Sequence, residues 1–349
     1  MINPTLARAA RRIFAASAAT LVFVSAGLAA EVNVYSYRQP QLVEPLFEKF
    51  TAETGIKVNT IFANKGLIER IEAEGRNSPA DVLLTTDISR LDQADHMGIT
   101  QPAASEILAK DIPAQFRDKD GRWMALTLRA RVIYASRERV KQDAITYEEL
   151  ADPKWRGKIC TRSGQHDYSL GLIASMIVHH GEEKAEAWLR GVKANLAGKP
   201  TGNDRSQVKG VFSGECDIAL GNTYYMGLMQ TNDKEPEQKQ WAESVKVLFP
   251  NAGDRGTHVN VSGMFMAKHA PHPAEALKLM EFLASDEAQR VYAEVNFEYP
   301  VKAGVAASDR VQSWGTLKAD TVSLTEIARA RAKASELVDK VGFDDGPAS

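Results

Sequence analysis

The sequence predicts an α/β protein built as two lobes, and two observations lead to this fold class. Segments with the alternating pattern of strands are repeatedly followed by segments whose apolar residues recur at helical spacing, which is typical of a sheet with parallel strand pairs and covering helices. The chain has 349 residues and shows two such series. This length is sufficient for two hydrophobic cores. Two α/β lobes joined by crossing strands therefore fit better than one long domain.

The first strand–helix series lies directly after the N-terminal segment. Its strands either alternate apolar and polar residues or are short and continuously apolar, and its first helix carries Leu46, Phe47 and Phe50 on one side. In chain order the predicted elements are a strand at 32–35, a helix at 43–53, a strand at 57–62, a helix at 66–74 and a strand at 80–84.

The second series follows a strand that begins at Arg131. Pro153 and Gly157 end a short helix, and a long apolar stripe marks the last helix. The predicted elements are strand 131–136, short helix 147–157, strand 159–161, helices 170–180 and 182–196, a strand ending at residue 220, strand 259–267 and helix 273–295.

These elements suggest four parts of the chain. Residues 1–30 are expected to form a signal peptide. We expect residues 31–128 together with 262–305 to form the first lobe, and residues 129–261 to form the second. The C-terminal residues 306–349 are predicted to form a helical segment that packs on the lobes.

The N-terminal thirty residues have the features of an export signal. Three arginines precede an apolar or small stretch from Ile13 to Leu28, and Ala29-Ala30 offers a small-residue cleavage site. Arg11-Arg12-Ile13-Phe14 also matches a twin-arginine signal, so either Sec or twin-arginine export to the periplasm is expected. Cleavage removes three arginines and no acidic residue, which takes the formal charge from −2 to −5. An acidic protein without a basic stripe is a poor candidate for nucleic acid or an anionic membrane.

Two cysteines are present, Cys160 and Cys216, an even number in an exported chain. Each lies beside a strand-like run, so a disulfide between neighbouring strands is geometrically reasonable. Two inert buried thiols are the alternative.

Two adjacent tyrosines follow the apolar run that ends at Leu220. Neighbouring side chains of a strand point to opposite faces, so Tyr224 and Tyr225 can face one cleft only beyond the strand's end. The pair Gly221-Asn222 is predicted to provide that break. Phenolate oxygen is a hard, anionic donor suited to Fe(III). The alternative is one core ring and one surface ring.

Several separated motifs carry a resemblance to a known family. They are NVYSYR (33–38), LTLRARVIYASRERV (126–140), ELADPKWRGKICTRSGQHDYS (149–169), GECDIALGNTYY (214–225) and EYPV (298–301). In these motifs and their order, the mature chain resembles the ferric-iron-binding members of the periplasmic substrate-binding proteins of ABC importers. The resemblance implies a type II, Venus-flytrap fold with hinge strands between the lobes. It also implies capture of Fe(III) and its delivery to a permease in the inner membrane.

The resemblance carries iron ligation onto three tyrosines, Tyr168, Tyr224 and Tyr225. Both segments are turns between a strand and a helix, where ligands of such sheets bind. Three phenolates would neutralise the 3+ charge of the ion. For Tyr168 the alternative is a ring at the start of its helix with a solvated hydroxyl.

The first lobe departs from the family pattern. Some relatives have a His-Tyr pair after the first strand, where this chain has Gln39-Pro40. Tyr37 lies nearby and could ligate, or could be buried. The missing oxygens could come from carbonate or bicarbonate as a synergistic anion. Arg38, Arg129 and Arg131 are the candidates to hold it, because a guanidinium matches a planar oxyanion.

Two other functions are weighed against iron binding. The same fold could bind phosphate, thiamine or a polyamine, but such sites use hydrogen-bond donors or aromatic boxes rather than a phenolate cluster. An exported enzyme would need an activated nucleophile or an acid–base pair, which the sequence does not display. We therefore expect a monomeric binding protein and no enzymatic activity.

Overall fold

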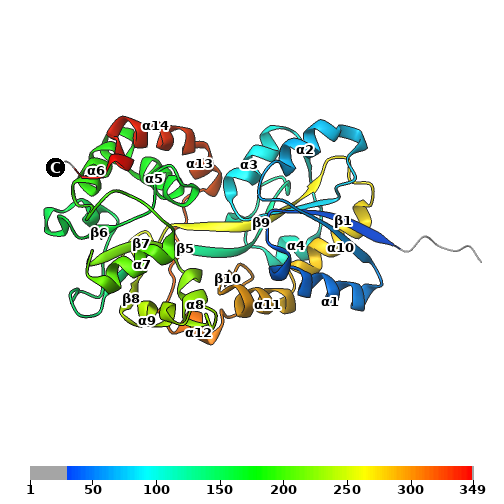
Figure 1. The fold of residues 1–349 in the computed structure, drawn as a ribbon. Coiled ribbons are helices and arrows are strands. Elements are labelled where there is room, and N and C mark those ends of the chain that lie inside the picture. Colours follow the sequence, from blue (N-terminus) through cyan, green and yellow to red (C-terminus); the bar gives the residue numbers. More distant parts are fainter. Residues whose placement is uncertain (1–29, 348–349) are drawn as a thin grey trace, which may run out of the picture.

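The computed structural model describes residues 30–347 and arranges them as two α/β lobes that lie side by side (Figure 1). Strands of both lobes belong to one connected set of ten, in the order β2-β1-β3-β9-β5-β7-β6, with β10 and β8 paired to β5 and β4 paired to β9. The strands are β1 (Glu31–Ser36), β2 (Lys57–Phe62), β3 (Val82–Thr85), β4 (Thr100–Gln101), β5 (Met124–Ser136), β6 (Ile159–Cys160), β7 (Ile218–Asn222), β8 (Val245–Leu248), β9 (Val259–Ala267) and β10 (Tyr299–Pro300).

Strands β5 and β9 connect the lobes. The first half of β5 pairs antiparallel with β9, and its second half, from Arg131 on, pairs with β7 and β8. Every residue of β5 and β9 is buried. In Figure 1 both strands run through the waist between the lobes. A site between the lobes is therefore lined by β5 residues close to the change of partner strand.

Helices cover the sheets of both lobes. In the first lobe they are α1 (Glu44–Thr54), α2 (Leu67–Glu74), α3 (Ile88–His96), α4 (Glu106–Asp111), α10 (Pro273–Leu283) and α11 (Asp286–Asn296). In the second they are α5 (Asp167–His180), α6 (Glu182–Ala194), α7 (Asp204–Ser213), α8 (Tyr224–Gln230) and α9 (Glu237–Glu243), with the short α12 (Asp309–Gln312) against α8. The C-terminal helices α13 (Leu324–Arg329) and α14 (Arg331–Val341) follow, and α13 touches both α3 and α5.

Several predicted elements agree with the structure, and others need correction. Helix α1 buries Leu46, Phe47 and Phe50 as predicted. The helix expected at 273–295 is two helices, because Ser285 caps α11 by accepting the amide N–H of Ala288. The short helix expected at 147–157 is a pair of 3₁₀ turns, Glu148–Ala151 and Pro153–Trp155. The strand expected at 131–136 begins earlier, at Met124.

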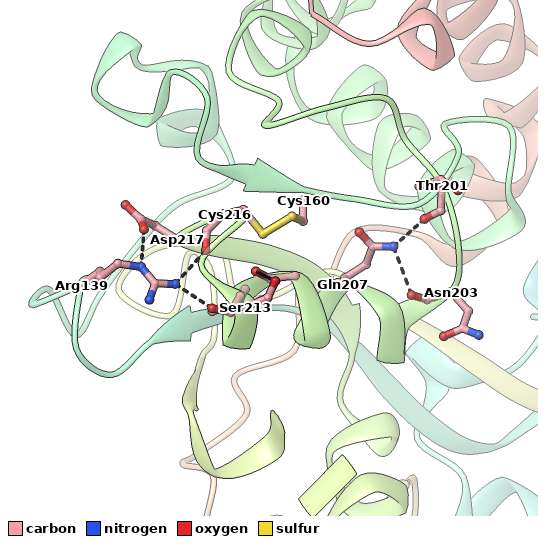
Figure 2. The surroundings of a disulfide bond; sticks show 10 residues. Arg139, Cys160, Thr201, Asn203, Gln207, Ser213, Cys216 and Asp217 are labelled. Atoms are coloured by element: carbon pink, nitrogen blue, oxygen red, sulfur yellow. Dashed lines mark hydrogen bonds and ion pairs between the residues drawn. A yellow bond between two sulfur atoms is a disulfide. The ribbon is translucent and has the colours of Figure 1, made fainter. Parts of the chain in front are cut away.

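The predicted disulfide is confirmed. Cys160 and Cys216 are bonded, with their Cα atoms 5.8 Å apart. The bond joins the end of β6 to the segment just before β7 and lies above α7 in the view of Figure 2. Beside it, the Arg139 guanidinium pairs with Asp217 at 2.6 Å and donates to the Cys216 carbonyl. The disulfide and these contacts fix the start of β7, the strand that leads into the tyrosine pair.

The predicted signal peptide lies outside the described residues, apart from Ala30. Within residues 30–347, no helix combines the length and the apolar character needed to cross a membrane.

Candidate metal-binding site

The tyrosine pair lies at the start of α8, immediately beyond β7. Tyr224 and Tyr225 are the first two residues of that helix, and their ring centroids are 4.3 Å apart. The prediction that the pair follows the strand's end is therefore confirmed. The predicted break at Gly221-Asn222 is wrong, because both residues still belong to β7.

Gly221 has a packing role instead of a turn role. A Cβ atom at this position would lie 2.1 Å from the Tyr134 ring, so only glycine lets β7 pass so close to that side chain. The Tyr134 hydroxyl then donates to the Asn222 carbonyl oxygen. Thr223 makes the turn, and its hydroxyl accepts the backbone N–H of Ala130 on β5. These contacts fix the position from which α8 begins.

Tyr168 approaches the pair from α5. It lies in the first turn of that helix, where the His166 side chain caps the helix by accepting the Tyr168 backbone N–H at 3.1 Å. The hydroxyls of Tyr168 and Tyr224 are 3.0 Å apart. Tyr168, Tyr224 and Tyr225 all line one cavity of about 310 Å³ between the lobes. The structure thus brings together the three tyrosines that the sequence singled out.

The cavity strongly favours the neutral forms of Tyr224 and Tyr225. Burial, and then the neighbouring phenols of Tyr168 and Tyr225, raise the pKa of Tyr224 well above its ordinary value. Burial is also the main cause that raises the pKa of Tyr225 to about 12. A multivalent cation reverses this preference, since it stabilises the ionised form of any oxygen that it contacts. The cluster can therefore hold a highly charged ion at the cost of releasing protons.

Tyr37 lines the same cavity from the first lobe, but its hydroxyl already has partners. It accepts the backbone N–H groups of Leu67 and Ile68, at 2.9 and 3.0 Å, at the start of α2. The Arg90 guanidinium lies 4.1 Å from the ring centroid. Burial raises the pKa of Tyr37 as well. Gln39 also lines the cavity, whereas Pro40 starts a 3₁₀ turn, Pro40–Leu42.

A buried carboxylate links several residues that surround the tyrosine cluster. Asp204, fully buried at the start of α7, accepts from Arg131 at 2.9 Å and from Arg162 at 3.0 Å. It also accepts the Asn222 backbone N–H at the end of β7. The Arg162 guanidinium in turn lies 5.1 Å from the Tyr168 ring. Arg131 thus pairs with Asp204 through Nη1 and does not line the tyrosine cavity, although its Nε and Nη2 are buried without a partner among the described residues.

Arg38 and Arg129, the other two predicted anion ligands, do line the cavity. Arg38 forms a two-pronged pair with the buried Glu298 at 3.0 and 3.3 Å. Arg129 donates through Nη1 to the Ser262 hydroxyl at 2.9 Å. Among the described residues, Nη2 of Arg129 and Nε of Arg38 are buried and have no hydrogen-bond partner. Buried donors without partners are costly, so an anion between them would be stabilised.

Sequence reasoning missed a third cavity arginine, Arg205 in the first turn of α7. Its guanidinium lies 5.1 Å from the Tyr225 ring, and its Nε is buried without a partner in the described part of the chain. Only the helix N-cap sequence Asn203-Asp204 could have placed Arg205 in the first turn of a helix. Asn296 was missed too, and both polar atoms of its side chain lack described partners. Further unpredicted lining residues are Leu42, Asn64, Thr86 and Leu228.

The donors that meet in this cavity are phenol oxygens. Within residues 30–347, no group of three histidine, cysteine, aspartate or glutamate side chains is arranged to hold a metal ion.

Comparisons with known proteins agree with this architecture. Residues 77–319 match the family model described as bacterial extracellular solute-binding protein. Iron uptake protein A1 of a Synechocystis species is 49% identical over 316 residues, which covers 90% of this chain and 87% of that protein.

Two solved structures extend the comparison to the fold. Ferric iron-binding protein A of Mannheimia haemolytica, in an open conformation, is 51% identical and superposes with a TM-score of 0.86, covering 91% of this chain and all of that one. A Trichodesmium protein in complex with iron and citrate is 42% identical, also with a TM-score of 0.86, covering 90% of this chain and all of that one. These matches confirm the predicted two-lobed α/β fold class.

Proposed function

The chain belongs to the bacterial extracellular solute-binding protein family, and we propose that it captures Fe(III) in the periplasm and delivers it to an ABC permease. Relatives at 49% and 51% identity carry the names of iron uptake and ferric-binding proteins, as the sequence resemblance implied. These names also confirm the prediction of a binding protein that is not an enzyme. The relatives include one named as a periplasmic protein, which supports the proposed compartment.

The observation that carries this proposal is the meeting of three phenols in one cavity between the lobes. We propose Tyr168, Tyr224 and Tyr225 as the ligands of Fe(III), because ionised phenol is a hard donor and the ion is hard and small. Three phenolates balance the 3+ charge, so no net charge is left unpaired at the metal. Phosphate, thiamine or a polyamine would leave this cluster unexplained.

We further propose that a small oxyanion, carbonate or bicarbonate, completes the shell. Arg38 and Arg129 offer buried donors without partners beside the tyrosines, and Arg205 offers a third. The Trichodesmium relative, whose structure contains iron together with citrate, supports a shared metal and anion site. Arg131 contributes indirectly, through its pair with Asp204.

Tyr37 is the remaining candidate ligand from the first lobe. Its oxygen could reach a metal only by giving up the two N–H donors at the start of α2, or by sharing its lone pairs with them. An anion held by arginines needs no such exchange. We therefore propose that the anion occupies the remaining coordination positions of the metal, and Tyr37 is the alternative ligand.

Iron capture by this fold is proposed to act through closure of the lobes. We place the first lobe at residues 31–128 and 262–305 and the second at 129–261, with residues 306–349 packed on them and residues 1–30 removed on export. Ligands come from the second lobe and the anion-holding Arg38 from the first, so binding would favour the closed state. We propose that the mature protein acts as a monomer.

The experiment is reconstitution of metal-free mature protein with Fe(III) and bicarbonate. One iron per protein and a visible phenolate-to-iron charge-transfer band are expected. Absence of iron after reconstitution, with a different small molecule retained, would contradict the proposal.

A further inference from the structure

The C-terminal helix α14 carries a buried arginine that contacts both lobes. Arg331 is the first residue of this helix and is 9% exposed. Its Nη1 donates to Asp87 and its Nη2 to Asp167, each at 2.8 Å. Asp87 is the N-cap residue of α3 in the first lobe, whereas Asp167 is the first residue of α5 in the second. One guanidinium therefore joins the N-terminal ends of two helices from different lobes.

Both carboxylates are direct sequence neighbours of residues that line the tyrosine cavity. Thr86 precedes Asp87, and Tyr168 follows Asp167. The preceding helix α13 packs against α3 and α5, whereas α14, which carries Arg331, packs on α5 and α6 of the second lobe. A change in this contact would thus act on the position of Tyr168 relative to the first lobe.

The two halves of the contact differ in strength. Asp87 is buried and also accepts from Ser89 and from Asn260 on β9. Its burial opposes ionisation, yet Arg331, Ser89 and Arg129 together hold its pKa below the ordinary value. The Asp167 side chain is 52% exposed, so water can replace Arg331 there at small cost. Helix α14 itself packs on α5 and α6 of the second lobe. The pair with Asp87 is therefore the contact that crosses between the lobes, and Asp167 holds the guanidinium from the side of the second lobe.

We propose that Arg331 is an interlobe clasp, a positioning residue that is held on the second lobe by α14 and Asp167 and limits, through its pair with Asp87, how far the lobes move apart. The link to iron rests on the proposed function, because Tyr168 is carried on the helix that Asp167 begins. The link to lobe opening does not rest on it, since it concerns the metal-free protein as well.

The first test variant is Asp167→Asn, which removes the second-lobe carboxylate that holds the guanidinium in position for Asp87 and leaves no buried charge unpaired. The matched control is Glu183→Gln, another exposed acidic residue in the first turn of a second-lobe helix, which forms no ion pair with a described residue. Spin labels at Lys110→Cys in α4 and Lys234→Cys in the second lobe report the distance between the lobes. Asp167→Asn is expected to raise the ratio of open to closed metal-free protein roughly two- to fivefold, the range for an exposed ion pair. The control should leave it unchanged.

Iron dissociation provides the second readout. It should be faster in Asp167→Asn by a similar factor, while thermal unfolding stays close to wild type, which separates positioning from a general loss of stability. Arg331→Lys keeps the charge but lacks the planar fork, so it should open the lobes like Asp167→Asn. The proposal is overturned if either variant shows the wild-type distance distribution. If the distances shift but no variant or wild type binds iron, the clasp stands and the proposed function fails.

Discussion

Removing the two adjacent phenol oxygens provides the sharpest test of the candidate site. The double variant Tyr224→Phe with Tyr225→Phe keeps both rings, which stack at 4.3 Å, and deletes two of the three proposed anionic donors. We expect the protein to fold, to lose the visible band after reconstitution, and to show no compaction on iron addition in solution scattering.

The size of the thermal effect follows from ligand linkage. At a thousandfold excess over its dissociation constant, iron should stabilise the wild-type protein by about 4 kcal/mol. For a mature chain of about 320 residues, an unfolding entropy of about 2.1 cal/mol/K per residue converts this into a rise of roughly 6 °C in the melting temperature. The double variant should show no such rise. Its metal-free form loses the hydrogen bond between Tyr168 and Tyr224, which costs about 1 kcal/mol.

The control is Tyr299→Phe. This buried hydroxyl has no hydrogen-bond partner among the described residues, and it does not line the tyrosine cavity. The control should therefore bind iron, show the band and keep the thermal shift, as measured by absorbance and scanning calorimetry. Iron binding by the double variant at wild-type affinity would refute the site, and Tyr168 would then be an ordinary ring in the first turn of α5.

Three further outcomes are expected. Removal of carbonate and bicarbonate by degassing should weaken iron binding, and adding bicarbonate should restore the band; an unchanged affinity would favour Tyr37 as the missing ligand. Because the pKa of Tyr225 is raised to about 12, this phenol is protonated at neutral pH, so iron must displace its proton. Each phenolate formed should release one proton, and the affinity should fall by up to about tenfold per pH unit per phenolate on acidification, which calorimetry in buffers of different ionisation enthalpy can count. Replacing the disulfide by Cys160→Ser with Cys216→Ser should lower the free energy of unfolding by up to about 4 kcal/mol, measured by denaturant titration, and should leave the iron band in place.

Much of the fold could be predicted because it depends on local patterns. The strand at 57–62 and the strand at 259–267 have the predicted bounds, since runs rich in β-branched and apolar residues mark them in the sequence. The helix at 273–295 could not be divided by periodicity alone. Its apolar stripe continues across Ser285, and the break is decided by the capping bond of that hydroxyl.

Residues of the cavity could be predicted from the sequence where they follow the end of a strand, as Tyr168 and Tyr224 do. It could not be predicted where it depends on distant partners. Arg129 and Arg131 lie two residues apart, a spacing that puts both side chains on one face of a strand. However, β5 changes its partner from β9 to β7 between them. Arg129 consequently reaches the cavity, while Arg131 pairs with Asp204, 73 residues away. No local pattern contains that pairing.

The charged side chains that line the cavity explain why Fe(III) without an anion would bind weakly. Arg38, Arg129 and Arg205 line it and only Glu298 opposes them, so its formal charge is +2 while the phenols stay protonated. Fe(III) with three phenolates adds no net charge, and the two positive charges then remain uncompensated in a partly desolvated space. In the proposed site, a doubly charged oxyanion would remove them and occupy the donor positions that the arginines leave open. The same arginines would repel a bare cation and favour its entry together with an anion such as carbonate.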